Sequence, residues 1–399
     1  MKFLKNIFLG DKYLIAFIMV LVLGSLLTGL SASSNIEYAA KTGTIWGQFG
    51  RQFSFMIIGL VMMFGMQLVN YKILFGISRI AIVLIIPLLF LTISQGTVID
   101  GAGASRWLKV PGIGVSIQTS TFASLILMVY ISGYLNNVRN QKITLKNSGI
   151  PLFLAILIIG LIFPANGSTA IMLFAMVVTI LFIGGFPIKY LAILGSTVVL
   201  LGFLFVFVAL NYGDAIPNSR VHTWKNRIER FTNPSENSLE SWQETNAKTA
   251  IVEGGITGKG PGKSAIKHTL PQASSDFIFA IIVEEYGLLG GSAAIFFYLL
   301  ILWRIVVIAT KVQNFFGTLL VFALGLPIIF QAIINIGVAV GLFPTTGQPL
   351  PMISFGGTSL WATCISFGII LSVSRHIPKT GDNPLDIPEN LKEMPYETL

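Results

Sequence analysis

The sequence predicts an all-α, polytopic membrane protein with about ten transmembrane helices and one large extracytoplasmic loop between helices 7 and 8. Of its 399 residues, 54% are hydrophobic and only 11% are charged, and its mean hydropathy is +0.79. Soluble domains carry roughly 25% charged residues. Apolar runs also recur at the length of about 20 residues that a helix needs to cross hydrocarbon. Residues 1–399 are therefore expected to form a single integral membrane domain.

Ten apolar segments are long enough to be considered as spans. In chain order they are 13–32, 52–70, 75–94, 116–135, 149–164, 167–186, 188–211, 277–308, 315–340 and 356–375. The eighth is too long for one span and contains Gly287, Gly290 and Gly291. Its first part is expected to be a partly embedded half-helix, with the complete span beginning near Leu288.

Lysine and arginine in the short loops predict the orientation, because they concentrate on the cytoplasmic side. This bias places both termini in the cytoplasm and the 212–276 loop outside. The tail 376–399 is rich in Pro, Asp and Glu and is expected to be a flexible cytoplasmic segment.

Composition excludes several functional classes. Cys364 is the only cysteine, so neither an internal disulfide nor a cysteine metal cluster can form. The formal net charge is +9, but the basic residues lie mainly in short loops between apolar runs. They are better explained by topology and by contact with anionic membrane lipids than by nucleic-acid binding.

Asp276 is the strongest candidate for chemistry. It ends the polar loop and immediately precedes an apolar helix, where a carboxylate is costly and therefore suggests a function. Glu284 and Glu285 follow eight and nine residues later, about 12 Å further along a helix. They are too far to work as a pair with Asp276, and a role in anchoring the break at Gly287 competes with a functional one.

A glycine-rich segment, 254–264, precedes Asp276 and is followed by Lys267. It is not a P-loop, because Thr257 occupies the position where the first glycine is required, so no nucleotide is expected. The backbone N–H groups of Gly258, Gly260 and Gly262 are candidates for binding a lipid diphosphate. A simple flexible loop remains the alternative.

Two further segments face the same outer edge. Arg106 precedes the interfacial residue Trp107, so it either clamps a phosphate or extends to lipid headgroups. The segment 335–359 has almost no charge but many Gly, Pro and hydroxyl residues. Non-helical backbone at membrane depth must be buried in protein or line a cavity. We therefore expect it to form a cavity wall, with Ser354 as a candidate substrate contact.

Three motifs together resemble the SEDS family of bacterial cell-wall polymerases, which includes RodA and FtsW. They are 270–287, 347–359 and 103–107. The end of the last helix, Ile370–Arg375, is more similar to FtsW than to RodA.

The resemblance implies a peptidoglycan glycosyltransferase of the bacterial cytoplasmic (inner) membrane. Such an enzyme joins lipid II into glycan strands and releases undecaprenyl diphosphate, working with a class B penicillin-binding protein. In the family the acid at Asp276 is essential, and Arg106 and Lys267 are expected to line the substrate path. An FtsW-like member would act at the division septum with other divisome proteins. Asp276 is expected to be either a base or a ligand of Mg²⁺ or Mn²⁺.

The chain departs from the family pattern at four positions. Thr121 and Ser124 stand where Glu and Lys are usual, Ala165 where Asp is usual, and Thr346 where Lys is often found. Three alternatives therefore stay open: a RodA-like elongation polymerase, a lipid II transporter, and a non-catalytic scaffold for a transpeptidase.

Overall fold

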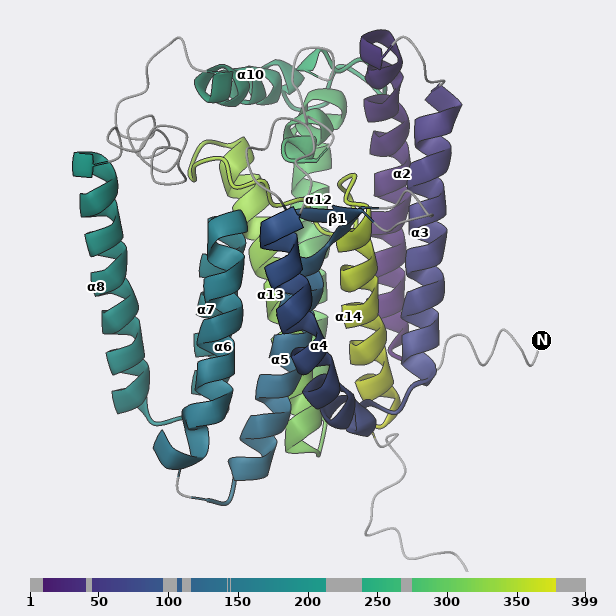
Figure 1. Ribbon diagram of the computed structural model, residues 1–399. Helices are drawn as coiled ribbons and strands as arrows, with labels where there is room; N and C mark the ends of the chain where they lie inside the picture. Colours follow the sequence, from purple (N-terminus) through teal and green to yellow (C-terminus); the bar gives the residue numbers. More distant parts are fainter. Residues whose placement is uncertain are drawn as a thin grey trace, which may run out of the picture.

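The computed structural model describes residues 10–40, 45–95, 106–109, 116–141, 143, 145–212, 239–266 and 275–377. Its helices are α2 (Lys12–Ala40), α3 (Ile45–Leu68), α4 (Leu74–Gln95), α5 (Thr119–Val138), α6 (Leu145–Ala165), α7 (Gly167–Ile183), α8 (Ile188–Tyr212), α10 (Leu239–Gly254), α12 (Ile278–Lys311), α13 (Phe315–Ala339) and α14 (Thr358–Arg375), with a short 3-10 turn, η1, at Tyr71–Ile73. Figure 1 shows the long helices standing side by side, with α10 lying across one end of the bundle.

Each of the ten predicted apolar segments contains a helix. Within the described ranges, eight helices are long and apolar enough to cross a membrane, namely α2, α3, α4, α5, α8, α12, α13 and α14. The apolar parts of α6 and α7 are shorter, at Asn147–Ile162 and Gly167–Ile183. The prediction of a polytopic membrane protein is confirmed.

The prediction of an all-α fold misses one short feature. Strand β1 (Trp107–Lys109) pairs antiparallel with β2 (Ser116–Gln118), so the fourth predicted span begins as a strand and becomes helical only at Thr119. Gln118 donates its backbone N–H to Thr358 Oγ1, at the start of α14, over 3.1 Å. The hairpin thus connects the N-terminus of α5 to the N-terminus of α14.

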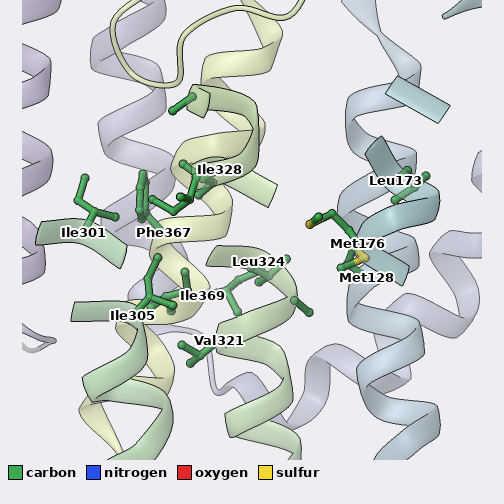
Figure 2. Close-up of a cluster of buried hydrophobic side chains, with 14 of the residues drawn as sticks. Met128, Leu173, Met176, Ile301, Ile305, Val321, Leu324, Ile328, Phe367 and Ile369 are labelled. Carbon is green, nitrogen blue, oxygen red and sulfur yellow. The ribbon is translucent and has the colours of Figure 1, made fainter. Parts of the chain in front are cut away.

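The centre of the bundle is α14, which packs on α3, α5 and α13. Phe367 of α14 is fully buried, with Ile328 of α13 beside it in Figure 2. Small residues let α3 approach α14 closely: an added Cβ on Gly368 would lie 2.5 Å from the Met63 carbonyl oxygen. Cys364 is buried in the same interface, facing Gly59, as expected of a packing residue.

The two ends of the described chain meet at one end of the bundle. Arg304 donates to both carboxylate oxygens of Asp11, over 2.7 and 2.5 Å. The Asp11 backbone N–H donates to Ser374 Oγ over 3.0 Å. Because α14 has 18 residues and therefore spans about 27 Å, the loop that precedes it lies at the opposite end.

Helix α12 is broken at Gly287, which has φ 69° and ψ −171°. This conformation is open essentially only to glycine. The break separates a half-helix, 278–286, from the complete span that begins at Leu288, as the sequence predicts. An added Cβ on Gly287 would also lie 2.1 Å from the Ile256 carbonyl oxygen.

Gly287→Ala is expected to destabilise the protein severely, because backbone strain of about 1–3 kcal/mol adds to a clash with main chain. Gly65→Ala in α3 is the matched control, since an added Cβ there meets nothing within 4 Å. That substitution should leave the melting temperature unchanged or raise it slightly. Thermal unfolding of the purified proteins in detergent measures both, and equal melting temperatures would contradict the assigned break.

Candidate functional site

Asp276 lies two residues before the half-helix of α12, and its neighbours fix its backbone. Ser354 donates its hydroxyl to the Ser275 carbonyl oxygen over 2.7 Å. Asn335 of α13 donates its side-chain amide to the carbonyl oxygen of Asp276 itself over 3.0 Å. The Ser275 hydroxyl donates to Asp276 Oδ1 over 2.9 Å. The carboxyl group is thereby held at the mouth of the bundle.

The loop 347–357 surrounds this position and is buried in protein, as the sequence predicts. Leu350, Ile353 and Ser354 are each at most 3% exposed, although none is helical. Ser354 both accepts from the Leu350 backbone N–H and donates to Ser275. The Ser354 hydroxyl is thus buried and bonded within the protein, where it positions Ser275, and its contact with substrate stays a prediction.

Arg106 reaches the same place from the start of β1. Its Nε donates to the Ala165 carbonyl oxygen over 2.9 Å. A Cβ built on Gly347 would lie 3.3 Å from Arg106 Nη1 and 3.7 Å from Asp276 Oδ2. The guanidinium and the carboxyl group therefore both lie close to Gly347, and the phosphate-binding role of Arg106 stays a prediction.

Two opposing effects set the charge state of Asp276. Burial disfavours the ionised form and is the larger effect, so the pKa of Asp276 lies above its ordinary value. The hydrogen bond from Ser275 and the positive charge of Arg106 both act to lower it. Asp276 is therefore a carboxyl group with a raised affinity for a proton and a cation nearby.

A cavity enters the bundle beside this cluster, between α5, α7, α13 and α14. Its outer end is polar, with Gln348 Nε2 donating to Thr169 Oγ1 over 2.7 Å. Its inner walls carry Met128, Met176 and Leu324, which face one another across the gap in Figure 2. Among the described residues that line it, none has a charged side chain. Thr121 and Ser124, two of the positions that depart from the family pattern, are among them.

The glycine-rich segment is used differently from the prediction. Gly258 N–H donates to the Gly254 carbonyl oxygen over 2.9 Å, and Gly260 N–H donates to the Glu285 carbonyl oxygen over 3.0 Å. The expectation that these two amides bind a diphosphate is corrected, because both already have acceptors. Gly262 lies in the exposed turn that follows, and its role stays a prediction. Lys267 lies outside the described residues.

The same segment instead pairs with the break in α12. Lys259 and Gly260 donate their N–H groups to the carbonyl oxygens of Glu284 and Glu285, and Leu288 N–H donates to the Gly255 carbonyl oxygen. Breaking a helix leaves backbone groups without helical partners. The segment 254–266 supplies those partners on both sides of Gly287.

Glu284 and Glu285 anchor this segment with their side chains, which confirms the structural interpretation of the two acids. Glu284 accepts from Lys259 Nζ at 2.8 Å, from Ser264 Oγ at 2.5 Å and from the Ala265 N–H at 2.9 Å. Glu285 accepts from the Ser31 hydroxyl of α2. Both carboxyl groups are buried. Because they bind the segment 254–266 and α2, neither is placed as a second acid beside Asp276.

Sequence reasoning missed three buried amides around Asp276: Asn166, Asn335 and Gln348. Asn335 is 1% exposed and also donates to the Gln348 carbonyl oxygen over 2.8 Å. The available signal at Asn335 was an amide in an otherwise apolar helix that also contains Gln331, since such groups must find partners inside the bundle.

Comparison with known proteins identifies relatives along nearly the whole chain. The family model described as "Cell cycle protein", which groups FtsW, RodA and SpoVE, matches residues 11–379. A protein of Nitrosococcus halophilus named "Probable peptidoglycan glycosyltransferase FtsW" is 30% identical over 91% of this chain and 92% of its own length. Stage V sporulation protein E of Bacillus subtilis is 32% identical over 82% of this chain and 86% of its own.

The fold also matches a solved structure. A chain from the structure "Structural coordination of polymerization and crosslinking by a peptidoglycan synthase complex" superposes with a TM-score of 0.72, over 93% of this chain and 99% of that one. At 23% identity this likeness establishes the fold alone.

Arg106→Gln is expected to raise the pKa of Asp276 further, because it removes the cation that favours the ionised form. Arg106→Lys, which keeps a positive charge, should restore most of the effect. Infrared titration of the carboxyl band, with Asp276→Asn as the reference for assignment, measures the midpoint. The same midpoint in wild type and Arg106→Gln would refute the electrostatic link.

Glu284→Ala should expose the segment 254–266, since it removes a buried carboxylate with four donors and leaves Lys259 paired with Glu253 alone. Each donor left buried without an acceptor costs about 1–3 kcal/mol. Glu244→Ala is the control, because its pair with Lys248 is exposed and belongs to one helix, where such pairs contribute about 0.5 kcal/mol or less. Hydrogen exchange of residues 254–266 should rise in the first variant and not in the second; unchanged protection in both would contradict the anchoring role.

Proposed function

We propose that this chain, which belongs to the FtsW, RodA and SpoVE family of cell cycle proteins, is a peptidoglycan glycosyltransferase. It polymerises lipid II into glycan strands on the outer face of the bacterial cytoplasmic membrane. The observation that supports this most directly is Asp276, a carboxyl group of raised pKa beside Arg106. Asn335 connects it to Gln348, which lines the cavity in the bundle.

The proposed mechanism assigns Asp276 the role of general base. Glycosyl transfer needs a base for the acceptor hydroxyl and stabilisation of the leaving group. Asp276 takes the proton from the 4-hydroxyl of the acceptor N-acetylglucosamine as that oxygen attacks C1 of the donor muramyl residue. Attack opposite the leaving group inverts C1 and releases undecaprenyl diphosphate. A raised pKa suits this role, because it increases the affinity of the carboxylate for the proton.

A divalent cation, Mg²⁺ or Mn²⁺, is compatible with the donor groups near Asp276. Across the described ranges no set of three or more His, Cys, Asp or Glu side chains is placed to hold a metal ion. The carboxylate of Asp276 would be the protein ligand, and Mg²⁺ commonly takes one or two protein ligands with water and substrate phosphates completing its shell. When bound it would neutralise charge on the diphosphate.

The cellular role proposed is septal synthesis in cell division, with a RodA-like role in elongation as the alternative. Relatives named FtsW and the FtsW-like sequence at Ile370–Arg375 support division. The solved relative comes from a peptidoglycan synthase complex, which supports a class B penicillin-binding protein as partner, together with other divisome proteins. Asp276 lies at the end of the bundle opposite Asp11 and Ser374, which is consistent with cytoplasmic termini and an outer site.

The decisive experiment is lipid II polymerisation by the purified protein with its cognate penicillin-binding protein. The transpeptidase is blocked, and Mg²⁺ or Mn²⁺ is present. Wild type should make long glycan strands, and Asp276→Asn should lose at least about 100-fold in rate, as expected when a general base is removed.

Because burial raises the pKa of Asp276, the folded protein binds the carboxyl proton more tightly than the unfolded chain does. The free energy of unfolding therefore falls as pH rises through the raised pKa. Asp276→Asn should therefore be at least as stable as wild type at neutral pH.

Near-normal polymer from Asp276→Asn would refute the assignment of the base. No polymer from wild type, with the partner shown to bind, would instead favour a lipid II transporter or a scaffold.

A further inference from the structure

The turn between α6 and α7 carries a buried hydrogen-bond donor with no acceptor. Asn166 is 2% exposed and caps α7: its Oδ1 accepts from the Thr169 N–H at 3.3 Å and lies 2.9 Å from Ser168 Oγ. The backbone N–H can only donate, so this contact fixes which end of the side chain is oxygen. The other end, Nδ2, is a donor that finds no acceptor within the described part of the protein.

A second unpaired group lies across the same contact. The Ser168 hydroxyl also lies 2.9 Å from the Thr346 carbonyl oxygen, which joins the turn to the loop around Asp276. Thr346 Oγ1 is buried and, like Asn166 Nδ2, has no partner among the described residues. A buried polar group without a partner is costly. Two such groups on either side of Ser168 therefore indicate a place where an acceptor binds.

This place adjoins the candidate catalytic group. Arg106 binds the carbonyl oxygen of Ala165, the residue before Asn166, and its Nη1 approaches Gly347, the residue after Thr346. Asp276 Oδ2 approaches Gly347 as well. The two residues with unpaired groups are thus the chain neighbours of the positions that Arg106 and Asp276 approach, Ala165 and Gly347. The N-terminus of α7, a helix of 17 residues, adds a positive potential that favours an anion at the same corner.

We propose that Asn166 Nδ2 and Thr346 Oγ1, together with Arg106, bind the diphosphate of the polyprenyl-linked donor. This rests on the proposed function and deepens it by assigning the leaving group to the α6–α7 turn. A diphosphate matches the site because its oxygens accept hydrogen bonds and its charge is opposite to that of Arg106. The segment 254–266 leaves this role open, since Gly258 and Gly260 donate their amides within the protein.

The test is direct binding of a polyprenyl diphosphate to the purified full-length protein, measured by titration calorimetry. Asn166→Asp keeps an oxygen to cap α7 but replaces the donor with a second, negatively charged oxygen. It is expected to weaken binding about tenfold to 100-fold. Thr346→Val removes only the hydroxyl and should weaken binding by a smaller factor. Asn314→Asp is the matched control, because Asn314 caps α13 by accepting from the Phe316 N–H and should bind as wild type does.

Inorganic diphosphate serves as a second probe, because it shares the anionic group and lacks the lipid chain. If it binds wild type and is weakened by Asn166→Asp in the same proportion, the contact is with the diphosphate itself. Unchanged affinity for both probes in Asn166→Asp and Thr346→Val, with unchanged melting temperatures, would overturn the proposal. If Asn166→Asp fails to fold, Thr346→Val decides alone.

The binding measurement is independent of polymerisation. Wild type that binds the diphosphate and makes no polymer would contradict the proposed function and keep this site. If wild type makes polymer while Asn166→Asp binds the diphosphate normally, the proposed function is kept and this site is contradicted.

Discussion

The break in α12 at Gly287 is the constraint on which the rest of the site depends. Interrupting a helix inside a membrane protein leaves N–H and C=O groups that lipid cannot satisfy. Here the segment 254–266 satisfies them through backbone hydrogen bonds on both sides of the break. Glu284 and Glu285 extend the attachment to Ser264 and to Ser31 of α2. The backbone groups on both sides of Gly287 thereby have hydrogen-bond partners although the helix is interrupted.

The half-helix 278–286 is held at its other end as well, and this is what places Asp276. Asn335 and Ser354 bind the backbone of Asp276 and Ser275, so the position of the carboxyl group does not depend on its own side-chain contacts. The half-helix consequently connects the segment 254–266 to Asp276, with hydrogen bonds at both of its ends.

Much of this could be predicted from sequence, and the part that could not has a physical reason. The apolar segments and the break at Gly287 follow from hydropathy and a local glycine, and the spacing of Glu284 from Asp276 already favoured an anchoring role. Glycine at positions 258 and 260 shows that backbone N–H groups can be exposed, but it does not show which carbonyl oxygen accepts them. Strands β1 and β2 are three residues each, too short to carry a pattern. Asn166 looks like an ordinary turn residue in the sequence, because its burial and its unpaired Nδ2 arise only from contacts made in the folded protein.

The neutral surroundings of Asp276 follow from the chemistry that a base requires. A carboxylate that accepts a proton works better when its pKa is raised, and each nearby cation lowers that pKa. Arg106 already exerts this effect. A further cation at Thr346 would help to hold a diphosphate, but it would also weaken Asp276 as a base. Amide and hydroxyl donors at Asn166 and Thr346 bind phosphate oxygens without adding charge. Within the described residues, one acid, one cation and several neutral donors would thus stabilise the proposed leaving group and preserve the proton affinity of Asp276.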